Sequence, residues 1–162
     1  SIWSEKITPK TIIIMYKLGW FGYFLGCYKK CLKFSGRASR TEYWSFQLFK
    51  WMTYILVVVF IDEKYSPSVL GTLIILNILP DIAVCIRRLH DTDVSSKQWV
   101  YFVLIPYILS ILSPIFKGTF IFAIIAFYVI AAAVRVFYLT IQAGDIVENK
   151  YGLPPEDEKF QK

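Results

Sequence analysis

Two short segments of this sequence are dense in arginine and in groups that can bind anions. The first, FSGRASRTEYW, starts at Phe34, and the second, RRLHDT, starts at Arg87. Arginine forms paired hydrogen bonds with phosphate and carboxylate groups. The two segments therefore predict a binding site for a lipid headgroup or for an acidic segment of a partner protein. Its residues are Arg37, Arg40, Arg87, Arg88 and His90.

The same two segments also carry groups that can satisfy the arginines internally. Ser39, Glu42 and Asp91 can tie the start of one helix to the end of the next, and we favour this structural network over the anion site. Catalysis is the least favoured interpretation, because His90 and Asp91 are adjacent and neighbours on a helix face different ways. The sequence has no phosphate-binding glycine loop, nucleophile elbow or zinc-ligand spacing. We expect no enzyme activity, cofactor or metal ion.

Three charged residues interrupt otherwise apolar stretches: Lys50, Asp81 and Arg135. Asp81 lies six residues before Arg87, and Arg135 lies six residues before Ile141, which is roughly 9 Å along each helix. Opposite charges at equal depth predict an ion pair between Asp81 and Arg135, with Lys50 as a competing partner of Asp81. The alternative is that Arg135 extends to the headgroups while Asp81 faces a wet vestibule.

The elements that carry these residues are four stretches of mostly apolar residues. They cover residues 43–61, 67–86, 98–116 and 119–141. At 1.5 Å per residue, about twenty residues cross a hydrocarbon core of about 30 Å. The loops between the stretches are short, so neighbouring helices run antiparallel. We predict an all-α membrane protein, an up-down bundle of four transmembrane helices with an N-terminal interfacial helical segment.

Residues at the ends of these stretches favour helix boundaries there. Ser39 and Ser95 each begin a capping-box pattern. Gly118 fits the position after a helix end, and Thr119 fits the cap of the next helix. Pro80 lies inside the second stretch and predicts a kink.

The lysines and arginines are unevenly distributed around the apolar stretches. Net charge is +6, and fourteen lysines and arginines fall on one side of the membrane against two on the other. The positive-inside rule therefore predicts that both termini are cytoplasmic. The excess of lysine and arginine on this side also favours attraction to anionic lipid headgroups. We do not expect nucleic-acid binding.

The chain divides by composition into three segments. Residues 1–33 predict a cytoplasmic or interfacial segment, in which residues 12–28 lie on the membrane rather than cross it. Residues 34–144 form the transmembrane domain, and residues 145–162 form a cytoplasmic tail.

Three separated motifs carry a resemblance to a known family. FSGRASRTEYW is followed by LPDIAVCIRRLHDT, and the tail contains Glu148-Asn149-Lys150-Tyr151-Gly152. From about Cys31 to Pro155 the chain resembles the YhaH-type family of small bacterial inner-membrane proteins, domain of unknown function 805. The resemblance implies a four-span inner-membrane protein without an established activity. Asp81 departs from the small serine usual in that family, and Asp93 departs from a loop richer in glycine.

We expect a non-enzymatic accessory subunit or a scaffold that interacts with lipid and protein through its arginine-rich cytoplasmic face. Its expected partners are anionic membrane lipids and a membrane protein complex or further copies of the same chain. The alternative is a component that transports a small solute or an ion, using Asp81, Lys50 and Arg135.

Overall fold

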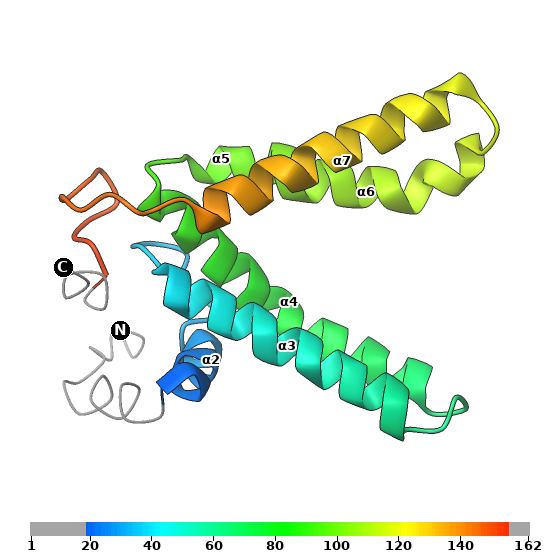
Figure 1. Ribbon diagram of the computed structural model, residues 1–162, viewed down its shortest axis with the longest axis horizontal. Helices are drawn as coiled ribbons and strands as arrows, with labels where there is room; N and C mark the ends of the chain where they lie inside the picture. The colour runs from blue at the N-terminus through cyan, green and yellow to red at the C-terminus, as the bar shows by residue number, and fades with distance from the viewer. Residues whose placement is uncertain (1–18, 156–162) are drawn as a thin grey trace. The chain divides into compact units, whose positions relative to one another are not determined.

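The structure is a computed structural model that describes residues 19–155, and these residues are almost entirely helical (Figure 1). In chain order the elements are α2 (Gly19–Lys29), α3 (Arg40–Phe60), α4 (Ser66–Asp91), α5 (Ser96–Trp99), the π-helix η1 (Val100–Leu104), α6 (Ile105–Leu112), the 3-10 helix η2 (Ser113–Phe116) and α7 (Phe120–Ile141). Within residues 19–155 the β pairing consists of one isolated bridge, between Asn149 and Gly152. The first part of the predicted interfacial segment, residues 12–18, lies outside the described residues.

Four helical segments are long and apolar enough to cross a membrane, by their length and composition. They are Arg40–Phe60, Ser66–Asp91, Ser96–Phe116 and Phe120–Ile141. The prediction of an all-α protein with four membrane-spanning helices is therefore confirmed. The packing of all four helices into one bundle stays a prediction.

The chain divides into two compact units. Among the described residues, one unit comprises 19–34 together with Thr41–Val84, and the other comprises Ser35–Arg40 together with 85–155. The N-terminal helix α2 therefore groups with the α3–α4 hairpin, and the tail groups with the hairpin of the third span and α7. These units cross the segment boundaries that composition suggests.

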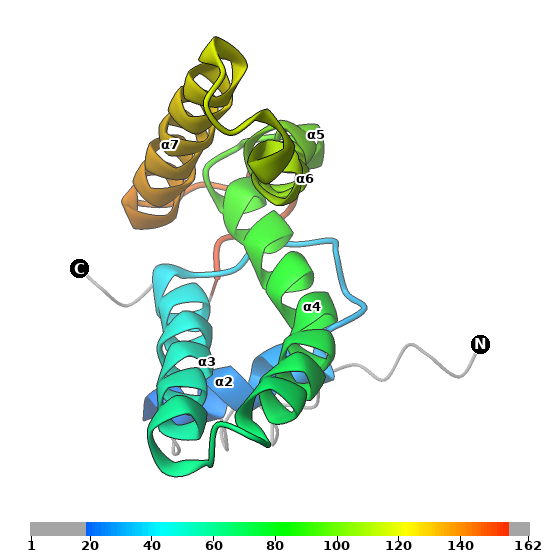
Figure 2. The same cartoon turned by 90° about the vertical axis from the view of Figure 1, so that its right-hand side faces the viewer.

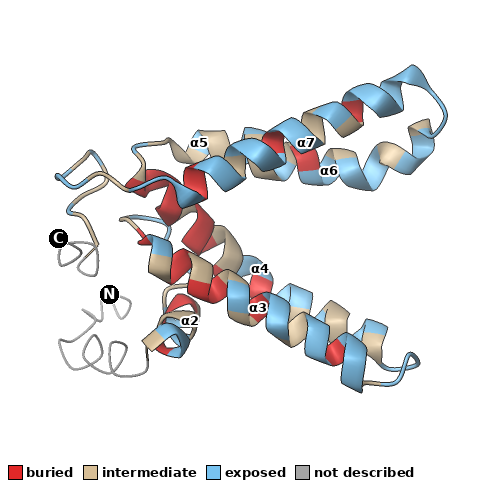
Figure 3. Cartoon of the chain, in the orientation of Figure 1, coloured by how far each residue is buried: buried red, intermediate tan, exposed pale blue. Residues whose placement is uncertain are grey.

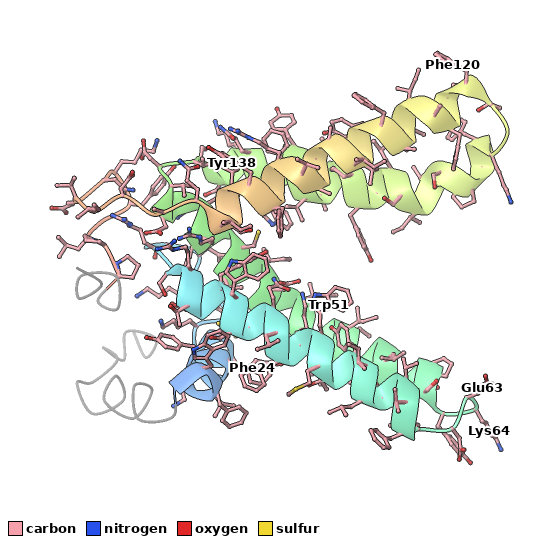
Figure 4. The ribbon with its side chains drawn as sticks, viewed as in Figure 1. Phe24, Trp51, Glu63, Lys64, Phe120 and Tyr138 are labelled. Carbon is pink, nitrogen blue, oxygen red and sulfur yellow. The ribbon has the colours of Figure 1, made fainter. Side chains whose placement is uncertain are left out.

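In the first unit, α2 lies across the α3–α4 hairpin (Figure 2). Phe24, labelled in Figure 4, lies on α2. Its ring packs against Phe46 and Phe49 of α3, with ring centroids 5.8 Å and 5.4 Å apart. The hydroxyl of Tyr28 donates a 2.7 Å hydrogen bond to the side-chain oxygen of Asn77 on α4. Aromatic pairs and a satisfied polar contact thus hold α2 on both helices.

In the second unit, the third span is irregular where Pro106 enters it. The amide of Ile105 bonds the carbonyl of Val100, five residues back, which is the π register. The next amide in that register is missing because Pro106 has no N–H. The carbonyl of Tyr101 therefore loses its helical donor, and the hydroxyl of Tyr128 on α7 donates to it at 2.6 Å.

Three of the predicted boundary residues lie at helix ends in the structure. The Ser95 side chain accepts from the Lys97 amide, and Gly118 has φ +84°. Thr119 occupies the cap position of α7, but its hydroxyl donates to the carbonyl of Phe116 at 2.6 Å. Thr119 therefore takes the predicted cap position but makes no side-chain cap, because its hydroxyl is used by the preceding turn.

The C-terminal end of α4 closes with a left-handed residue that is not glycine. Asp93 has φ +55°, and the Val94 amide bonds the carbonyl of Leu89 at 2.9 Å. The Asp93 amide bonds the carbonyl of His90 at 3.2 Å. These two bonds form a Schellman motif, in which the left-handed residue lets the chain turn off the helix.

The described residues bury several charged side chains and expose many large apolar ones. Many large apolar side chains on the long helices are exposed, such as Phe60 at 78% and Phe120 at 81% (Figure 3). Lipid-facing helices carry such surfaces, because lipid tails solvate apolar groups. In contrast, Arg87, Arg88, His90 and Asp91 are all buried at the end of α4. We take this buried polar cluster as the candidate site.

Candidate functional site

Asp91 lies at the centre of the cluster and binds two arginines. Its Oδ1 accepts from Nε of Arg37 at 2.8 Å, and its Oδ2 accepts from Nη1 of Arg88. The exposed fractions of the three side chains are 1% for Arg37 and 0% for Arg88 and Asp91. Buried charges are stable only when paired and fully hydrogen-bonded, so the excess positive charge requires further acceptors.

Arg88 finds these acceptors at the end of α7. Its Nε donates to the carbonyl of Thr140 at 3.2 Å, and its Nη2 donates to the carbonyl of Gln142. The last carbonyls of a helix have no helical donor and carry partial negative charge. Arg88 therefore caps α7 while neutralising part of its own charge.

Arg37 makes the corresponding contacts with the segment that follows α7, residues 142–153, which we call the C-terminal loop. Its Nη1 donates to the carbonyls of Val147 at 2.8 Å and Gly152 at 3.3 Å. Its Nη2 donates to the carbonyl of Asp145. One buried guanidinium thus holds three points of this loop.

His90 joins the segment before α3 to the segment after α4. Its Nδ1 lies 3.1 Å from the carbonyl of Gly36, and its Nε2 lies 2.5 Å from the hydroxyl of Ser96. A carbonyl only accepts, so Nδ1 carries the proton and Nε2 accepts from Ser96. The ring also stacks on Tyr151, with centroids 3.8 Å apart and planes 5° from parallel.

The C-terminal loop also satisfies the last carbonyls of α4. The Asp145 amide bonds the carbonyl of Asp91 at 2.9 Å, and the Asn149 side chain bonds the carbonyl of His90 at 3.0 Å. Gly144 lies against the Asp91 carboxylate, so a Cβ there would sit 1.9 Å from Oδ2. At the edge of the site, a hydrogen bond to the Asp93 carboxylate raises the pKa of the exposed Lys150.

The structure brings together some of the predicted site residues and separates others. Arg37, Arg88, His90 and Asp91 meet in the second unit. The buried Arg87 also lies at this end of α4, where its carbonyl accepts from the Ala38 amide at 3.0 Å, next to the buried Ser39. Glu42 belongs to the first unit, and Arg40 is exposed at the start of α3.

Glu42 has its own contacts in the first unit. Its Oε1 and Oε2 accept from Nζ of Lys30 at 3.2 Å and 3.3 Å. The thiol of Cys27 lies 4.0 Å from Oε1.

These contacts match a self-contained network more closely than an anion site. The guanidinium groups of Arg37 and Arg88 are bonded to Asp91 and to main-chain carbonyls, and both ring nitrogens of His90 are used. An anion would have to displace these contacts. Among residues 19–155 there is no group of three or more His, Cys, Asp or Glu side chains able to hold a metal ion.

The predicted ion pair inside the membrane needs a correction. The Oδ2 of Asp81 accepts from Nζ of Lys50 at 2.9 Å, and Oδ1 accepts from the amide of Gln47 at 2.8 Å. Both oxygens are thus taken by side chains of α3, one turn apart. The partner of Asp81 is Lys50, the competing choice, while Arg135 lies on α7 in the other unit with an exposed side chain.

Sequence reasoning missed the contribution of the C-terminal loop to the site. Gly144, Asp145 and Asn149 supply a close approach, an amide and a side-chain donor to the end of α4. The Glu148–Gly152 motif was the sequence feature that pointed to this loop. It marks the loop but does not say what the loop contacts.

Comparisons with known proteins agree with the family resemblance. The family described as "Protein of unknown function (DUF805)" matches residues 31–153. Inner membrane protein YhaI of Escherichia coli strain K12 is 36% identical over 88 residues, which cover 53% of this chain and 74% of YhaI. Inner membrane protein YhaH of the same strain is 38% identical over 93 residues, covering 53% of this chain and 75% of YhaH. No solved structure matches the chain.

Proposed function

Since this chain belongs to the DUF805 family and is an integral membrane protein, we propose that it works by binding and not by catalysis. Its role is that of an accessory subunit or scaffold in a membrane protein complex. The C-terminal loop is the surface that meets the partner. The proposal also places this loop on the cytoplasmic side of an inner membrane, as the lysine and arginine distribution predicts.

The observation that supports this proposal is a loop with a held backbone and exposed apolar side chains. Arg37 holds the carbonyls of Val147 and Gly152 through the same nitrogen, which brings two parts of the loop close together. Yet the exposed fractions of Ile146, Val147 and Leu153 are 79%, 75% and 64%. A rigid loop loses little conformational entropy on binding, so apolar side chains on it contribute efficiently to affinity.

The chemistry of the neighbouring residues supports binding over catalysis. His90 and Asp91 are the groups that an enzyme would use as acid and base, and both are bonded within the protein. Their contacts fix the loop that presents the apolar side chains. The buried cluster therefore has a positioning role in this proposal.

Site-specific crosslinking in intact membranes tests the proposal. A photoreactive residue at position 147 is expected to form an adduct with one defined membrane or cytoplasmic protein. Ile146→Ser combined with Val147→Ser is expected to abolish copurification of that protein and to leave the melting temperature unchanged, because both side chains are exposed. The matched position is Ile115, 74% exposed in η2, which is expected to give no such adduct. Equal labelling at 115 and 147 would refute the proposal.

A second candidate, an ion or small-solute pathway, is favoured by one observation. Lys50, Gln47 and Asp81 form a polar cluster within the α3–α4 hairpin, and the Asp81 side chain is 37% exposed. Charged groups within membrane spans often line transport routes. Liposomes that contain the wild-type protein would then leak ions or small solutes, and liposomes with Asp81→Ala would not. If the wild-type protein causes no leak, this candidate is rejected.

A further inference from the structure

Helix α2 carries one exposed face that changes from apolar to basic along its length. Residues four apart lie on the same side of a helix. Phe21 and Leu25 are 46% and 39% exposed, and Lys29 is also exposed. Trp20 flanks the apolar end with 58% exposure, and Lys33 follows the basic end in the turn after the helix.

The contacts that α2 makes with α3 fix how the helix lies, and the partly exposed Phe21 takes part in them. Near its start, the ring of Phe21 packs on Phe49 with centroids 5.5 Å apart. At its end, Lys30 binds Glu42, which is on the first turn of α3. Phe49 lies seven residues beyond Glu42, which is roughly 10 Å along α3. Since α3 spans the membrane, the start of α2 lies deeper in the bilayer than its end.

The slope of α2 matches its exposed face. The deep end carries Trp20, Phe21 and Leu25, and the shallow end carries Lys29 and Lys33. Interfacial helices bury apolar side chains about 5–10 Å into the boundary between headgroups and acyl chains. Tryptophan prefers this boundary. Lysines at the shallow end then meet the headgroups, where each is attracted by anionic lipid.

We infer that the exposed face of α2 is a binding site for anionic phospholipid, with Lys29 and Lys33 at the headgroup and Trp20, Phe21 and Leu25 along the acyl chains. This site is separate from the C-terminal loop and does not depend on the proposed protein partner. It also differs from the arginine cluster, in which the guanidinium groups of Arg37 and Arg88 are bonded within the protein. Lys30 does not contribute, because Glu42 binds it.

Titration of the delipidated full-length protein with phosphatidylglycerol or phosphatidylcholine, followed by native mass spectrometry, tests the inference. The wild type is expected to prefer phosphatidylglycerol. Lys29→Gln with Lys33→Gln is expected to reduce that preference by at least tenfold, since each near-surface lysine contributes about fivefold. Lys64→Gln with Lys117→Gln removes the same charge from two exposed loop positions and is expected to change nothing. An unchanged preference in the Lys29/Lys33 variant would overturn the inference.

Two further measurements separate lipid binding from simple anion binding. Glycerol 3-phosphate, which lacks acyl chains, is expected not to compete with phosphatidylglycerol, and competition at similar concentration would contradict the acyl contact. A spin label at Leu25→Cys, in a variant without Cys27, Cys31 and Cys85, is expected to be more accessible to oxygen than to a water-soluble nickel relaxant in nanodiscs. Greater accessibility to nickel would place α2 in water and reject the site.

Discussion

Gly144 leaves the space in which the carboxylate of Asp91 sits. A Cβ at this position would lie 1.9 Å from Oδ2 of Asp91, which is already bound to Arg88. Because the carboxylate and both arginines are buried, none of them can move into solvent to relieve the clash. The glycine is therefore required by a neighbour and not by its own backbone angles.

Gly144→Ala is expected to destabilise the protein by about 2 kcal/mol, as overpacking of a tight interior does. The melting temperature in detergent is then expected to fall by about 5 °C. The matched change is Gly71→Ala on α4, where a Cβ meets nothing within 4 Å. Alanine is the better helix former, so this variant is expected to be as stable as the wild type or more stable. Equal melting temperatures for the two variants would show that Gly144 is not constrained.

At the scale of single residues, sequence predicted which side chains would cluster but not what they would bind. Arg37, Arg88 and Asp91 are charged residues of opposite sign near helix ends, so a network among them was expected. Most of their remaining acceptors are carbonyls of the last turn of α7 and of the C-terminal loop. Every residue carries a carbonyl, so the sequence has no signal for which ones are used.

At the scale of elements, the third span depends on a contact from its neighbour α7. Pro106 removes the amide that would satisfy Tyr101, and the Tyr128 hydroxyl replaces it. Tyr128→Phe is expected to cost about 1–2 kcal/mol, because the carbonyl is left without its donor. In a Pro106→Ala background the new amide supplies that donor, so the same change is expected to cost much less. Melting temperatures of the four proteins in the cycle check this, and purely additive effects would contradict it.

The α3–α4 hairpin contains the other contact that is expected to matter for stability. Asp81→Asn leaves Lys50 charged without its partner inside the membrane, at a cost of up to about 3 kcal/mol. Arg135→Gln alters an exposed side chain and is expected to change stability by no more than about 0.5 kcal/mol. Thermal melts in detergent compare the two variants. If Arg135→Gln lowered stability more than Asp81→Asn does, the result would favour the Asp81–Arg135 pair that the sequence predicted.

The sequence predicted the spans because the requirements for a membrane-spanning helix depend only on the residues of that helix. A helix in lipid must satisfy its own backbone and be apolar for about twenty residues, and both requirements are visible in composition. The choice between Lys50 and Arg135 is different, because it depends on which helices are neighbours and how they are rotated. The π-helix before Pro106 also depends on a donor from α7, which lies more than twenty residues away in the chain.

At the scale of the whole molecule, the distribution of lysine and arginine gives a testable orientation. Single cysteines at positions 64 and 117, in a variant without the three native cysteines, are expected to react with an impermeant maleimide added outside the cell. Cysteines at positions 97 and 150 are expected to react only after permeabilisation. The physical reason is that basic loops are retained on the cytoplasmic side during insertion. Labelling at position 64 from the cytoplasmic side alone would contradict this orientation.

The contacts of Arg37 have a consequence for biosynthesis. This residue precedes the first span, whereas the carbonyls that it binds follow the last span, at Asp145, Val147 and Gly152. The ribosome therefore has to synthesise the chain at least to Gly152 before Arg37 can meet all three carbonyls. A nascent chain that stalls before this point has only Asp91 as a partner for the Arg37 guanidinium, so the buried cluster is completed late in synthesis.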